Sequence, residues 1–115
     1  MRNSDFVPPD ALRRLQNGAQ RHLAALIADG EKHDLPPLAW TLAVSGALTG
    51  EADSLTYTPT GQREAIRQWT AHVGATVDTS HTADGREELY AGWLNDEHMT
   101  RGCFRATIFV HREDA

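Results

Sequence analysis

A serine next to a glycine, Ser45-Gly46, is the first place in the chain where the residue types suggest catalysis. A serine nucleophile on a sharp strand-to-helix turn needs the pattern G-x-S-x-G. Here the run is Ala43-Val44-Ser45-Gly46-Ala47, so both outer glycines are missing. A phosphate-binding loop would need a lysine directly after its second glycine, and Glu51 follows Gly50. The stretch therefore predicts a structural role.

Histidine is abundant, with six residues among 115. Four of them lie in the second half of the chain near acidic side chains that could join them around a metal ion: His72, His81, His98 and His111. Metal sites commonly place two histidines four apart on a helix or two apart on a strand. Neither spacing occurs, so the sequence predicts no metal site and no cofactor. The histidines are interpreted as solvated or hydrogen-bonded in the core.

The remaining reactive side chains also lack a catalytic arrangement. Glu87 and Glu88 are adjacent in a segment with strand periodicity, so they point to opposite faces and cannot work as a paired acid and base. The single cysteine, Cys103, has no neighbouring thiolate-activating signature and is interpreted as a small apolar side chain. No catalytic residue is predicted, which favours a non-enzymatic protein.

Length, composition and charge narrow the class of protein. A hydrophobic fraction of 40% and a charged fraction of 23% are typical of one globular domain, predicted at residues 10–112. A flexible N-terminal lead (residues 1–9) and a C-terminal tail (residues 113–115) flank it. No apolar run is long enough for a signal peptide or a membrane span, and a lone cysteine is typical of a reducing compartment, so the expected location is the cytoplasm.

The net charge of −5 bears on the choice of partner. Nucleic-acid-binding proteins usually gather basic side chains into one patch that neutralises phosphates. In this chain both signs are spread without blocks. Binding to DNA or RNA is therefore disfavoured, unless the fold brings Arg101, Arg105 and Arg112 together.

Two helices are predicted. Apolar residues recur at intervals of three and four over residues 10–30, with Asp10 as the N-cap and Gly30 as the stop signal. The second helix has Thr58 as N-cap and Pro59 at its first position, and it ends near Val73, before Gly74.

Alternating large and small side chains over residues 38–49 predict one long strand that bends at Gly46. Three further strands are predicted at residues 75–81, 87–94 and 102–111, the first two joined by a turn at Asp84-Gly85. The element order is then α-β-α-β-β-β. This order predicts an α+β two-layer sandwich, with two helices on one face of a mainly antiparallel four-stranded sheet.

The strand pattern leaves one set of side chains outside the core. If Phe104, Ala106, Ile108 and Val110 meet the helices, the opposite face carries Tyr90, Arg105, Phe109 and His111. A face that mixes aromatic and charged side chains is typical of a protein-interaction surface. The predicted function is thus a small interaction or regulatory module that binds a protein partner or a second copy of itself.

The tryptophans leave an alternative open. Trp40, Trp69 and Trp93 are interpreted mainly as core residues. A pocket between the helices and the sheet near Trp40, Trp69 and His72 would instead make the protein a small-molecule binding domain or a minor enzyme.

Four stretches of the chain resemble small uncharacterised proteins of high-GC actinobacteria such as Streptomyces, some of them encoded near mobile elements. They are Leu35-Pro36-Pro37-Leu38-Ala39-Trp40, Gly46-Ala47-Leu48-Thr49-Gly50, the helix end from Trp69 to Gly74-Ala75, and Arg105-Ala106-Thr107-Ile108. The resemblance spans roughly residues 35–110. It implies no activity, so no functional residue is assigned from it.

Overall fold

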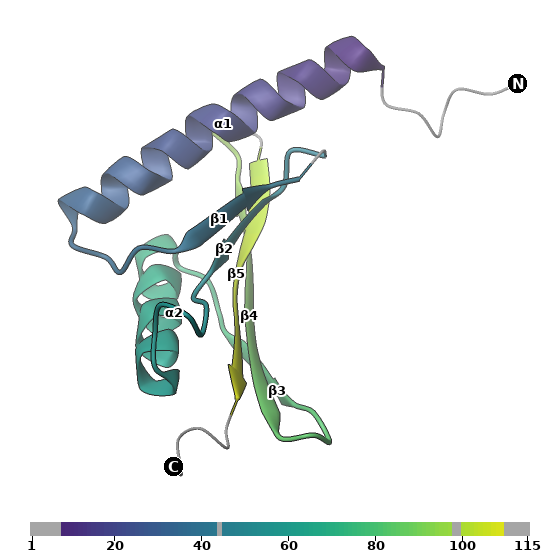
Figure 1. Cartoon of the computed structure of the whole chain (residues 1–115). Coiled ribbons are helices and arrows are strands. Elements are labelled where there is room, and N and C mark those ends of the chain that lie inside the picture. Colours follow the sequence, from purple (N-terminus) through teal and green to yellow (C-terminus); the bar gives the residue numbers. More distant parts are fainter. Residues whose placement is uncertain (1–7, 44, 98–99, 110–115) are drawn as a thin grey trace, which may run out of the picture.

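Two helices and a five-stranded sheet make up the computed structural model (Figure 1), which describes residues 8–43, 45–97 and 100–109. In chain order the elements are α1 (Pro9–Lys32), β1 (Ala39–Leu42), β2 (Leu48–Glu51), α2 (Pro59–Val73), β3 (Asp78–His81), β4 (Arg86–Asn95) and β5 (Thr100–Phe109). The strands lie in the order β1-β2-β5-β4-β3 across the sheet. The tail at residues 113–115 and most of the predicted lead lie outside the described residues.

The prediction of one long strand over residues 38–49 is wrong, because the chain reverses at Gly46. This glycine has a φ of 90°, its N–H donates to the carbonyl of Ala43 (2.9 Å), and the N–H of Ala43 donates to the carbonyl of Ala47 (2.8 Å). The result is a hairpin of β1 and β2. Trp40 lies opposite Gly50, and Leu42 lies opposite Leu48. The even-numbered positions of both strands therefore still share one face of the sheet, as the alternating pattern predicted.

The sheet therefore has five strands where four were predicted, and it contains a parallel pair. β2 pairs in parallel with β5, while the other three neighbouring pairs are antiparallel. The α+β class and the two-layer arrangement are as predicted. Both helices pack on the same face of the sheet, where Ala19 and Leu26 of α1 share one apolar cluster with Ile66 of α2.

Helix α1 is longer than the sequence predicted. It begins at Pro9 without a side-chain cap, so Asp10 lies in its first turn and is not its N-cap, and it continues through Gly30 to Lys32. A Cβ on Gly30 would lie 2.8 Å from the indole ring of Trp69. Gly30 thus permits close packing against α2 and does not end the helix. No helix in the described part of the chain is both long and apolar enough to cross a bilayer.

Helix α2 has the predicted ends. The Thr58 hydroxyl accepts a hydrogen bond from the N–H of Gly61 (3.1 Å), and Gly74 closes the helix with a φ of 76°. On the solvent side, Glu64 accepts hydrogen bonds from Arg67 Nε (2.9 Å) and Gln68 Nε2 (2.8 Å). These two hydrogen bonds lower the pKa of Glu64 to about 2 from its ordinary value of 4.5, and the bond from Arg67 has the larger effect.

The lowered pKa of Glu64 predicts a pH-dependent contribution to stability. The ionised carboxylate is favoured in the folded state, so its contribution is complete above the unfolded pKa and is lost as the pH falls from 4.5 toward about 2. We expect Glu64→Gln to lower the melting temperature slightly at neutral pH and not at all below about pH 2. Thermal denaturation across this pH range tests the expectation, with the exposed Glu97→Gln as control. A deficit that persists at the acid end would contradict it.

The core is centred on Trp69, which is 2% exposed. Its ring meets Trp40 edge to face (centroids 5.6 Å apart) and lies 5.7 Å from the ring of Phe104. Its Nε1 donates to the carbonyl of Pro36 (2.6 Å). Trp40 and Trp93 are partly buried and pack against the same cluster, which agrees with the interpretation of the tryptophans as core residues.

Candidate functional site

The helix-free side of the sheet gathers the residues predicted for an interaction surface. Tyr90 of β4 lies directly opposite Arg105 of β5, so both side chains share this side, and Phe109 lies further along β5. No described helix covers it, and β4 and β5 are the longest strands (Figure 1). His111 lies outside the described residues.

We call this side the open face. Strand register and alternation assign three kinds of side chain to it. The large apolar or sulfur-containing ones are Tyr90, Leu94, Cys103 and Phe109. The basic ones are Arg86, Arg101 and Arg105, and the acidic ones are Glu51, Asp78 and Glu88. Three basic side chains therefore accompany three acidic ones. Arg101 and Arg105 share the open face, as a nucleic-acid site would need, but acidic side chains lie on the same face. The third arginine of that prediction, Arg112, lies outside the described residues.

The open face contains a hollow of about 580 Å³. Its lining includes Tyr90, Gly92, Leu94, Arg101 and Cys103. Gly92 has no side chain to fill the space, and a Cβ there would lie 3.5 Å from the hydroxyl of Tyr90. The face thus offers a depression beside exposed Leu94, into which a side chain of a partner could pack.

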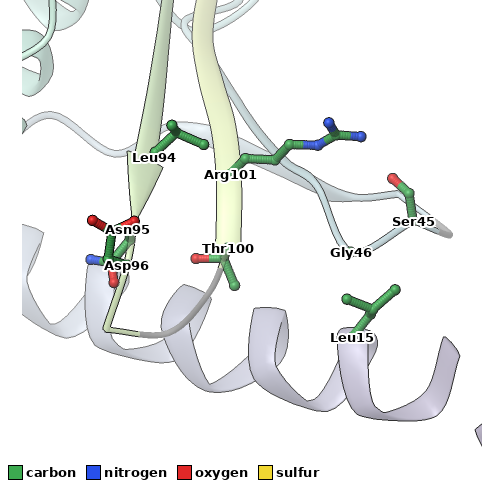
Figure 2. Close-up of a pocket in the computed structure, with 8 residues that line it drawn as sticks. All are labelled: Leu15, Ser45, Gly46, Leu94, Asn95, Asp96, Thr100 and Arg101. Atoms are coloured by element: carbon green, nitrogen blue, oxygen red, sulfur yellow. The ribbon is translucent and has the colours of Figure 1, made fainter. Parts of the chain in front are cut away.

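Ser45 borders a second hollow, of about 590 Å³, at one end of the sheet (Figure 2). It lies between α1, the β1–β2 turn and the β4–β5 turn, with Leu15, Asp96 and Arg101 among its lining residues. No histidine is among the described residues that line it. His98, between β4 and β5 in the sequence, lies outside the described residues, so the structural role predicted for the Ser45 stretch stays a prediction.

The predicted pocket near Trp40, Trp69 and His72 is not one cavity. Trp40 and Trp69 line a hollow of about 310 Å³, whereas His72 lines a separate one of about 390 Å³. Trp69 and His72 do touch, with ring centroids 6.2 Å apart. Because the indole of Trp69 is buried and its Nε1 is already bonded to Pro36, little of it is available to a ligand.

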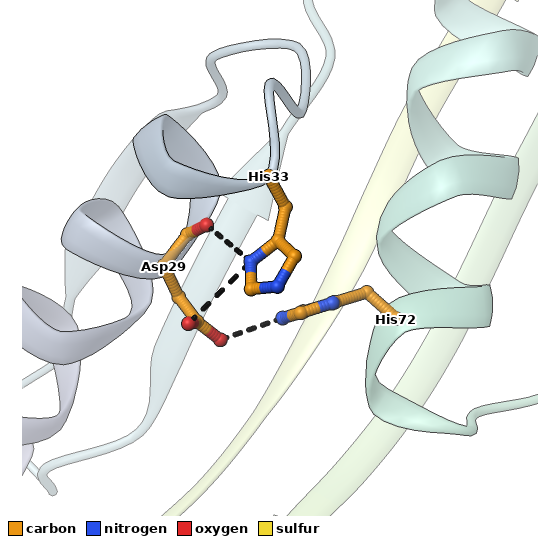
Figure 3. Close-up of side chains that lie close together, drawn as sticks. All are labelled: Asp29, His33 and His72. Carbon is orange, nitrogen blue, oxygen red and sulfur yellow. Dashed lines mark hydrogen bonds and ion pairs between the residues drawn. The ribbon is translucent and has the colours of Figure 1, made fainter.

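A cluster absent from the sequence-based prediction joins the two helices (Figure 3). His72, in the last turn of α2, approaches Asp29 of α1 with Nε2 2.6 Å from Oδ2. His33 Nδ1 lies 3.0 Å from the carbonyl oxygen of Asp29 and 3.6 Å from its Oδ1. The hydrogen bond with His72 is the main cause that lowers the pKa of Asp29 below its ordinary value.

Two of the three residues of this cluster, Asp29 and His33, have a spacing in the sequence that could have indicated it. Asp29 and His33 are four residues apart, which places both on one side of a helix, whereas the prediction of no metal site rested on the spacing between histidines alone. His72 joins them only through tertiary packing, because the contact of Gly30 with Trp69 brings the end of α1 next to α2. Sequence spacing alone gives no sign of that approach.

Comparison with known proteins adds no functional information. The chain matches no protein-family model, no curated protein and no solved structure. The geometry of the described residues is therefore the basis for any functional assignment. It offers two candidate sites, which are the open face and the cluster of Asp29, His33 and His72.

Proposed function

We propose that this protein is a small non-enzymatic interaction module that binds a second copy of itself through the open face. The observation that carries the proposal is the exposure of large side chains there: Tyr90 is 53%, Leu94 80% and Phe109 40% exposed. Burying apolar surface of this kind is the main driving force of protein association. Aromatic and arginine side chains are also the residue types that dominate binding energy in interfaces.

The charges on the open face support a second copy as the partner. A two-fold axis places a patch against itself, so a self-complementary patch needs both signs. The open face has Arg86, Arg101 and Arg105 together with Glu51, Asp78 and Glu88. An acidic or basic partner would instead favour an excess of one sign, and nucleic acid would require an excess of positive charge.

The dimensions of the open face are compatible with a dimer interface. β4 and β5 have ten residues each, which corresponds to about 33 Å of strand, and three shorter strands widen the face. A standard interface buries about 800 Å² on each partner. A face of this length and width is large enough to bury an area of that order.

The test is the molar mass in solution, measured by sedimentation velocity across a concentration series. We expect the natural protein to approach dimer mass as concentration rises. We expect Leu94→Asp to weaken self-association at least about tenfold, because it puts a charge into the exposed apolar surface beside the hollow of the open face. The matched control is Ile27→Asp, since Ile27 is also an exposed apolar residue (51%) but lies on α1. Circular dichroism checks that both variants are folded.

Two results would contradict the proposal. One is a natural protein that stays monomeric at every concentration. The other is a dimer that Leu94→Asp leaves intact while Ile27→Asp dissociates it, which would place the interface on the helical layer.

The alternative function, a small-molecule site between helices and sheet, has less support. Trp40 and Trp69 line a different hollow from His72, and Trp69 is part of the core. The three residues therefore do not converge on one ligand.

A further inference from the structure

The cluster of Asp29, His33 and His72 belongs neither to the apolar core nor to the open face. One possible ligand atom from each residue lies within 4.8 Å of the other two. All three side chains keep access to solvent, with exposures of 45%, 48% and 22% respectively. A hollow of about 390 Å³, lined by Asp29 and His72, adjoins them. The cluster is thus accessible to a small ion.

An ion pair that only ties the helices together would need one histidine, whereas this cluster has two. The second, His33, is held by its Nδ1, which lies 3.0 Å from the carbonyl oxygen of Asp29. A carbonyl oxygen can only accept, so Nδ1 carries a proton and, in the neutral imidazole, Nε2 keeps its lone pair. Histidines that bind metals are commonly held in this way, with the other nitrogen donating to a carbonyl or carboxylate. Figure 3 shows the ring of His33 beside that of His72.

The distances need little adjustment for metal binding. Ligand atoms about 2.0–2.2 Å from a tetrahedral zinc ion lie about 3.4 Å from one another. Asp29 Oδ2 and His72 Nε2, now 2.6 Å apart in a hydrogen bond, would release the proton between them when the metal binds and would move apart by less than about 1 Å. The possible ligand atom of His33, which lies within 4.8 Å of the other two, would move inward by up to about 1.4 Å. Rotation of partly exposed side chains at the ends of two helices can provide these shifts.

We propose that Asp29, His33 and His72 bind a divalent transition-metal ion of the zinc type, which joins the C-terminal end of α1 to that of α2. Two imidazoles and one carboxylate suit zinc and its neighbours, whereas magnesium and calcium prefer oxygen ligands throughout. Three protein ligands leave a fourth position for water or another small donor.

The test uses tag-free protein, so that an added histidine tag cannot bind the metal. Titration with Zn²⁺ against a chromophoric chelator should give one ion per chain. A concentration of free Zn²⁺ about a hundredfold above the dissociation constant should raise the melting temperature by roughly 10 °C. Mg²⁺ at the same concentration should not. This readout is independent of self-association through the open face.

Two variants locate the ion. His33→Ala and Asp29→Asn alter partly exposed side chains, so the fold should persist, and each should weaken Zn²⁺ binding by at least about tenfold. The control is His81→Ala, because His81 is exposed on the edge strand β3 and lies outside the cluster. Circular dichroism verifies that each variant is folded. The absence of Zn²⁺ binding by the natural protein would overturn the proposal, and so would unchanged affinity in either His33→Ala or Asp29→Asn.

Discussion

Replacing Trp69 with alanine is expected to lower the free energy of unfolding by about 3–5 kcal/mol. The side chain is 2% exposed and contacts Trp40 and Phe104, so its removal deletes apolar burial and leaves a cavity. It also leaves the carbonyl of Pro36 without its donor. Since the free energy of unfolding of a small domain is only about 5–15 kcal/mol, this loss would be a large part of it.

Urea denaturation followed by far-ultraviolet circular dichroism measures the effect of Trp69→Ala. Leu55→Ala is the control, because Leu55 is 97% exposed and should change stability by no more than about 0.5 kcal/mol. A loss below about 1 kcal/mol for Trp69→Ala would contradict the central place of this residue in the core.

Replacing Gly102 with alanine is expected to cost about 2–3 kcal/mol or more, although it adds a single methyl group. Gly102 lies on β5 between Leu48 of the parallel neighbour β2 and Trp93 of β4. A Cβ at this position would lie 2.4 Å from the carbonyl oxygen of Leu48 and 2.4 Å from Cζ2 of Trp93. The backbone of β2 cannot yield without disturbing the parallel pair.

Gly92 provides the matched control for Gly102. It lies on the adjacent strand β4, but a Cβ there would make only ordinary contacts, at 3.5 Å or more, with the ring of Tyr90. Urea denaturation should show Gly92→Ala within about 0.5 kcal/mol of the natural protein. Equal effects of the two substitutions would contradict the close packing of β2, β5 and Trp93 at Gly102.

Local signals in the sequence were sufficient for α2 and for the faces of β4 and β5. Thr58, Pro59 and Gly74 act within one turn of the helix ends, so their effect does not depend on the rest of the fold. The alternation that buries Phe104 and exposes Arg105 follows from strand geometry in the same way. These elements required no knowledge of their neighbours.

Tertiary packing decided the features that the sequence-based prediction missed. Gly46 is compatible with either a bend or a reversal, and the choice of a hairpin created the fifth strand. Gly30 resembles a helix stop, yet it accommodates the indole of Trp69. His72 reaches Asp29 through this packing. In each case the outcome depends on a residue distant in sequence or on the pairing of another strand.

We propose the open face as the surface through which the protein binds its own copy. The most direct measurement is a ¹H–¹⁵N correlation spectrum recorded across a dilution series. We predict that the peaks of open-face residues such as Tyr90, Leu94 and Arg105 move with concentration, while those of Glu64 and Arg67 on the outer side of α2 stay fixed. Peaks that move on α2 and not on β4 and β5, or a spectrum unchanged by dilution, would contradict self-association through the open face.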